Sequence, residues 1–154
     1  MRELAFRLRR GDDLRQSIEE KCKELHINTA VVLSGVGCVY RMKIRLANAV
    51  EYLEREEDFE IVSLTGTVSR GKAHIHVSLA DDSGNCIGGH LEKGCLINTT
   101  CELVLGILEE YETKREFDGE LSCAAPLLRR SRTGKCARCG RAAEGAYPCG
   151  CRCL

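Results

Sequence analysis

The chain has 154 residues, and its 23 lysines and arginines balance 23 aspartates and glutamates to a formal net charge of zero. This balance argues against a protein that binds nucleic acid mainly by counterion release, because such proteins normally carry a basic excess. The length suits one globular domain with a tail, and no apolar run approaches the roughly 18 residues of a transmembrane helix. We therefore expect a soluble protein with no membrane partner.

The amino-terminal segment MRELAFRLRR alternates charged and apolar residues and contains no continuous hydrophobic stretch. Such a segment is not expected to act as a secretory signal peptide. The cytoplasm is therefore the expected location of the protein.

A helix is predicted after an opening strand. Asp13 and Gln16 lie three residues apart and resemble a capping box, which marks a helix start. Asn28 is expected to close the helix. The apolar residues between these ends recur at helical spacing, at Leu14, Ile18, Cys22 and Leu25.

Strands are predicted for the rest of the globular part. Period-two alternation and β-branched runs place them at residues 29–33, 39–46, 59–69, 73–80, 86–91, 95–97 and 101–108. Closely spaced strands with one clear helix favour an α+β fold built on a mostly antiparallel sheet. A dinucleotide-binding fold is excluded, because Tyr40 replaces the third glycine of the fingerprint and a strand follows where a helix is required.

Arg41, Lys43 and Arg45 form a basic stripe on one face of the strand predicted at residues 39–46. The stripe could contact phosphate groups. A solvated sheet face is the favoured interpretation, because acidic residues crowd the segment 51–60 that follows.

Three of the four histidines fall close together, at His74, His76 and His90. His74 and His76 alternate with apolar residues in a predicted strand, so they share one face. The turn-forming segment DDSGN would return the chain and bring His90 beside the pair, and Gly88 and Gly89 would let another group approach the backbone closely there. Three imidazoles at this spacing could hold one divalent metal ion; the alternative is that all three are solvated strand or loop residues.

Three protein ligands with an open fourth position are typical of catalytic zinc, whereas structural zinc is usually enclosed by four. Glu60 and Glu102 lie in strand patterns and are candidates for a fourth ligand, a support for a ligand, or a general base. The alternative is that both are solvent-facing or paired strand residues.

Several stretches of the chain resemble one known family. FEIVSLTGT at residues 59–67, HIHVSLAD at 74–81 and GGHL at 88–91, with RLRRGDDL at 7–14 and SGVG at 34–37, resemble the plants-and-prokaryotes conserved domain. The resemblance covers residues 4 to 121. It implies an α+β fold with one main helix, a homotrimer, and zinc or another divalent metal held by the histidines that match His74, His76 and His90. The implied architecture is similar to that of acetolactate decarboxylase, a zinc enzyme with histidine ligands.

The resemblance also bears on DNA. In plants the domain accompanies AT-hooks and mediates assembly of nuclear DNA-binding proteins. This sequence lacks the Arg-Gly-Arg-Pro core of an AT-hook. We therefore expect weak DNA binding or none.

The composition changes at Arg129, which predicts a domain at residues 1–128 and a basic tail at residues 129–154. The tail is either a small segment folded around a second metal or a disordered, oxidation-prone extension. Its five thiols are Cys136, Cys139, Cys149, Cys151 and Cys153. The other cysteines, mostly in apolar contexts, are expected to pack as small hydrophobic side chains: Cys22, Cys38, Cys86, Cys95, Cys101 and Cys123.

Two functional hypotheses follow. In the first, the chain is a trimeric binding or assembly module, associated with DNA-bound regulation in the manner of the family, whose metal stabilises a pocket for an unidentified small ligand or partner. In the second, it is a zinc-dependent lyase or hydrolase whose open metal position acts on a small carbonyl-containing substrate. We prefer the first, because the sequence offers a metal triad but no convincing general base.

Overall fold

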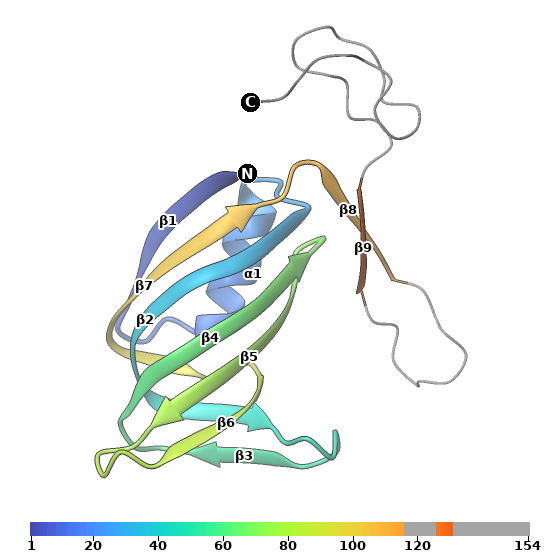
Figure 1. Cartoon of the computed structure of the whole chain (residues 1–154). Helices are drawn as coiled ribbons and strands as arrows, with labels where there is room; N and C mark the ends of the chain where they lie inside the picture. The colour runs from blue at the N-terminus through green and yellow to red at the C-terminus, as the bar shows by residue number, and fades with distance from the viewer. Residues whose placement is uncertain (116–125, 131–154) are drawn as a thin grey trace, which may run out of the picture. The chain divides into compact units, whose positions relative to one another are not determined.

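The computed structural model describes residues 1–115 and 126–130 (Figure 1). The chain divides into a first unit, Met1–Glu109, and a second unit that begins at Glu110. The described elements are β1 (Arg2–Arg9), α1 (Leu14–Glu24), β2 (Thr29–Arg45), β3 (Tyr52–Arg55), β4 (Phe59–Ser69), β5 (Lys72–Ala80), β6 (Cys86–Leu91), β7 (Leu96–Ile107), β8 (Tyr111–Arg115) and β9 (Pro126–Arg130).

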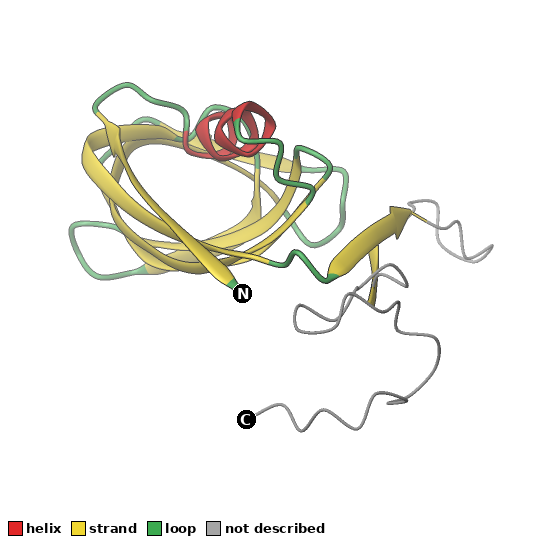
Figure 2. Cartoon of the chain, turned by 90° about the horizontal axis from the view of Figure 1, so that it is seen from above, coloured by secondary structure: helices red, strands yellow, loops and turns green. Residues whose placement is uncertain are grey.

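The first unit is a seven-stranded antiparallel sheet in the order β1-β7-β2-β4-β5-β6, with β3 paired to the end of β2. The last residues of β2 also pair with β6, Ile44 with Leu91 and Arg45 with His90. Strands β2, β4, β5 and β6 therefore form a closed ring, and Figure 2 shows the sheet curving around its core with the helix on one side. The predicted α+β class with a mostly antiparallel sheet and one helix is confirmed.

Helix α1 begins as the sequence predicts. Asp13 is its N-cap, and the Asp13 carboxylate accepts a hydrogen bond of 2.8 Å from the backbone N–H of Gln16. The buried face of the helix consists of Leu14, Ile18, Glu19 and Cys22. The helix ends at Glu24 and not at Asn28, because His26 adopts a positive φ of 53° that no helix can continue through. The helices of the described part of the chain include none long and apolar enough to span a membrane.

One core fills the space between the sheet and the helix. Strand β5 shows the pattern best, since Ala73, Ile75, Val77 and Leu79 are buried while the alternate residues face outward. Cysteines 22, 95 and 101 are buried in this core, as expected, and burial raises the pKa of Cys101 to about 12. The expectation is wrong for Cys86, which is exposed, and Cys38 is only partly buried. Cys123 lies outside the described residues. The buried thiols are protonated and act as packing groups.

Two pairs of predicted strands are each one continuous strand. The sequence pattern ended one strand at residue 33 and began the next at residue 39, but β2 runs through both and takes up the irregularity in register shifts between Val32 and Ser34 and between Gly37 and Val39. Strand β7 likewise joins the segments 95–97 and 101–108.

Three strands were not predicted: β3, β8 and β9. Strand β3 is rich in charge and lacks an apolar face, so its pattern did not identify it. It pairs with the basic stripe of β2, where Glu54 forms ion pairs with Arg41 and, at 3.2 Å, with Lys43. The stripe is therefore a salt-bridged, partly solvated sheet face, as the favoured interpretation predicted. In the second unit β8 and β9 form a two-stranded antiparallel sheet.

Candidate metal centre

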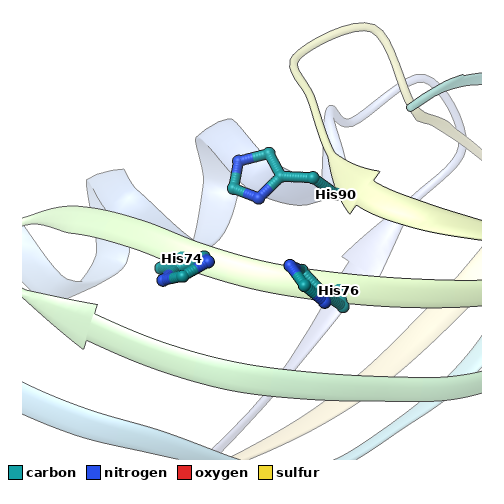
Figure 3. Close-up of side chains that lie close together, drawn as sticks. All are labelled: His74, His76 and His90. Atoms are coloured by element: carbon teal, nitrogen blue, oxygen red, sulfur yellow. The ribbon is translucent and has the colours of Figure 1, made fainter. Parts of the chain in front are cut away.

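The three clustered histidines come from neighbouring strands. His74 and His76 lie on the outer face of β5, and His90 on β6 is the register partner of His76. The ring centroids are 5.2 to 5.6 Å apart, and one ligand atom from each ring lies within 4.8 Å of the others. Figure 3 shows a nitrogen of the His90 ring pointing toward the other two rings. The structure therefore brings together all three histidines that the sequence analysis selected.

Two glycines allow β6 to lie close to both of its neighbours. A Cβ atom on Gly89 would lie 2.8 Å from the carbonyl oxygen of Arg45 on β2, and one on Gly88 would lie 3.0 Å from the carbonyl oxygen of Val77 on β5. Any larger residue at Gly89 would push the strands apart. The close approach predicted for these glycines is therefore confirmed, and it fixes His90 between β5 and β2.

His90 is the least exposed of the three imidazoles. Its Nδ1 atom is buried without a hydrogen-bond partner, and its Nε2 atom lies 3.8 Å from a carboxylate oxygen of Glu92. Burial, with the nearby positive charges of Arg45 and Arg15, lowers the pKa of His90 to about 4. The ring is therefore neutral at physiological pH, which is the form that binds a metal.

Arg15 of helix α1 connects the backbones of the two histidine-bearing strands. Its guanidinium donates to the carbonyl oxygen of Leu91, next to His90, at 3.0 Å, and to that of Ala73, next to His74, at 3.5 Å. The same group binds Glu92 at 2.6 Å and Glu19 at 3.3 Å. Arg15 therefore fixes β5 relative to β6 where the histidines lie.

Glu19 completes this connection from the helix. Its carboxylate is buried and accepts a hydrogen bond of 3.1 Å from the backbone N–H of Ala73. Glu19 thus accepts from the backbone N–H of Ala73 and Arg15 donates to its C=O, so the two side chains hold this residue of β5 through both of its backbone polar groups. Sequence reasoning missed these two residues because only the packing of α1 against β5 brings them to the site.

The two glutamates predicted as supporting residues lie elsewhere. Glu60 pairs with Ala80, four residues along β5 from His76, and Glu102 on β7 forms an ion pair of 3.3 Å with Arg7. The structure does not bring either side chain to the histidines. The carboxylate beside the triad is Glu92, which the sequence could have indicated because it lies two residues after His90 and so on the same face of the chain.

The donor set fits a divalent metal ion of the zinc type. Zinc accepts neutral imidazole nitrogens, and a ligating histidine usually has a carboxylate near its other ring nitrogen, as Glu92 lies near Nε2 of His90. A metal on Nδ1 would also give that buried atom the partner it lacks. The cluster of described residues that could hold a metal contains the three histidines and no fourth ligand.

Comparison with known proteins identifies related chains. Residues 1–109 match the family model of the Plants and Prokaryotes Conserved domain. The bifunctional protein GlmU of a Synechococcus strain is 37% identical over 118 residues, which cover 77% of this chain and 19% of that protein. The chain thus spans about a fifth of the length of this curated relative.

Solved structures share the fold. A protein from Salmonella enterica superposes with a TM-score of 0.80 at 25% identity, covering 84% of this chain and 94% of that one. The metal-containing protein AF0104 of Archaeoglobus fulgidus superposes with a TM-score of 0.67 at 31% identity, covering 82% of this chain and 94% of that one.

The unpartnered Nδ1 atom of His90 generates a prediction about stability. In metal-free protein, His90→Leu should leave the free energy of unfolding unchanged or raise it by up to ~1 kcal/mol, because it replaces a buried unsatisfied polar atom with an apolar group of similar size. Urea unfolding in the presence of a chelator measures this. His76→Leu is the matched control at an exposed position, where no gain is expected. A loss of more than about 2 kcal/mol in His90→Leu would show that the imidazole itself supports the fold.

Proposed function

The chain belongs to the plants-and-prokaryotes conserved domain family, and on that premise we propose that it is a metal-binding module in which His74, His76 and His90 hold one zinc or another divalent ion. The observation that supports this most strongly is the convergence of three imidazoles to within 4.8 Å, one of them neutral and with a buried nitrogen that lacks a partner. Helix α1 and the glycines of β6 keep the three rings together without the metal.

A bound metal with three protein ligands would polarise a carbonyl group or activate a water at its open position. This supports the second candidate function, a zinc-dependent lyase or hydrolase that acts on a small carbonyl-containing substrate. His74 and His76 are exposed, so a small molecule can reach the open position directly. We rank the binding module first, because Glu92, the carboxylate nearest the triad, is already bound by Arg15.

The metal proposal predicts how many divalent ions each chain binds. Full-length protein purified without chelator should lose one equivalent of divalent metal per chain on His90→Ala, as measured by elemental analysis after dialysis. His26→Asn is the matched control, because His26 is the one histidine outside the cluster and asparagine tolerates its positive φ. Equal metal content in the wild type and in His90→Ala would contradict the proposal, as would metal uptake by neither protein on titration.

The five carboxy-terminal cysteines lie outside the described residues. We keep a second metal site at Cys136, Cys139, Cys149, Cys151 and Cys153 as a proposal that rests on their spacing alone. The histidine variants above separate the two sites, because they remove metal from the triad and leave the cysteines intact.

Self-association is the second part of the proposal, and an exposed apolar surface supports it. Leu33 and Val36 on β2 and Val62 on the adjacent strand β4 are 46%, 61% and 58% exposed. The Leu33 side chain lies with Val31 around Gly106 on the outer face of the sheet. Grouped apolar side chains on a sheet face favour burial against another copy in a closed ring. We propose that this face forms the contacts of a homotrimer.

Light scattering under reducing conditions tests this surface. The wild type should have three times the chain mass of 17.1 kDa, and Val36→Asp should shift it toward the monomer, because a carboxylate would then be buried in the interface. Val50→Asp is the matched control, since Val50 is 74% exposed outside the strands. A monomeric wild type would contradict the trimer, and a trimeric Val36→Asp variant would place the interface elsewhere.

DNA binding should be weak. Arg41 and Lys43 of the basic stripe pair with Glu54 and the net charge is zero, so the chain has no basic excess to release counterions from DNA. Any duplex retained in a gel-shift experiment at low salt should dissociate near physiological salt. Tight, sequence-selective retention at that salt would overturn this expectation.

A further inference from the structure

The charges around the triad leave a bound divalent ion uncompensated. Three neutral imidazoles contribute no negative charge, and the nearest carboxylates are already matched by cations: Glu19 by Arg15, and Glu92 by both Arg15 and Arg45. A metal ion would therefore leave the site with an excess of about two positive charges. Such a site favours an anionic ligand at the open metal position.

Arg45 lies in the same row of side chains as two of the three histidines. Arg45 is the register partner of His90 across the β2–β6 pair, just as His76 is across the β5–β6 pair. Directly opposed residues project from the same face of an antiparallel sheet, so His76, His90 and Arg45 form one row. Adjacent strands are about 4.8 Å apart, so the backbone of Arg45 lies roughly one strand beyond that of His90, and its Nε lies 3.8 Å from the same Glu92 carboxylate that is near His90.

The two arginines near the triad differ in how many hydrogen bonds and ion pairs they form. Arg15 donates to two backbone carbonyl groups and also binds Glu19 and Glu92. Arg45 contacts Glu92 through Nε at 3.8 Å, and its terminal nitrogens form no hydrogen bond or ion pair with the described residues. The donors of Arg15 are therefore occupied by contacts within the protein, whereas Arg45 has N–H donors that a ligand could bind.

We propose that Arg45 is the ligand-binding cation of the metal centre and that the ligand is a small 2-oxo carboxylate. The carboxylate pairs with the guanidinium fork, which matches its planar geometry, and the neighbouring carbonyl oxygen occupies the open metal position. The charge of the carboxylate offsets part of the excess that the metal introduces. This inference rests on the proposed metal site and names the class of molecule that the site takes.

The test uses pyruvate as the probe and cobalt as a coloured substitute for zinc. Full-length protein with its five carboxy-terminal cysteines changed to serine is loaded with Co²⁺, so that thiolates of the tail do not contribute to the spectrum. Pyruvate should change the visible absorption of the cobalt in a saturable manner. Arg45→Met should weaken pyruvate binding by about 10- to 100-fold, the effect of losing a charge-assisted hydrogen-bonded pair, with cobalt content unchanged.

Arg41→Met is the matched control, because Arg41 lies on the same face of β2 and pairs with Glu54 away from the triad. It should bind pyruvate like the wild type. Equal pyruvate affinity in Arg45→Met and the wild type would overturn the role of Arg45, and so would equal affinity for uncharged methyl pyruvate. If inorganic phosphate binds more tightly than pyruvate and its binding depends on Arg45, the assignment of the ligand as a carboxylate would be overturned. Failure to take up cobalt at all would instead overturn the metal proposal on which this inference rests.

Discussion

The close contact of β6 with both neighbouring strands is the constraint on which the site depends. Two consecutive glycines let the backbone of β6 lie against carbonyl groups of β5 and β2, where a Cβ atom on Gly89 would meet an oxygen at 2.8 Å. This contact closes the ring of strands and at the same time sets His90 between His76 and Arg45. The fold and the site are therefore products of the same backbone geometry.

Helix α1 adds the second constraint, and it acts on the backbone of the ligand strands. Arg15 and Glu19 hold the peptide groups of Ala73 and Leu91, the residues adjacent to His74 and His90. Because these contacts are made to the backbone, they do not occupy Nδ1 of His90, which is buried and has no hydrogen-bond partner. A buried polar atom without a partner lowers stability in the absence of a ligand, which is typical of residues retained for binding.

Patterns of single strands were sufficient to identify the histidines but not their surroundings. Alternation placed His74 and His76 on one face, and the turn and glycines brought His90 to them, as the register confirms. The sequence placed Arg45 in the basic stripe but not beside His90, and it did not indicate Arg15, because both positions depend on a cross-strand pairing of distant segments and on helix packing. Glu60 and Glu102 were selected for lying in strands, but a strand position alone does not say which strands are neighbours.

The central claim is that one divalent ion is bound by three imidazoles from β5 and β6. X-ray absorption spectroscopy of the zinc-loaded full-length chain, with the five carboxy-terminal cysteines changed to serine, tests it most directly. The account predicts three imidazole nitrogens at about 2.0–2.1 Å from the zinc, together with one oxygen or nitrogen ligand and no sulfur. Sulfur at about 2.3 Å, or fewer than three imidazoles in the zinc shell, would contradict it.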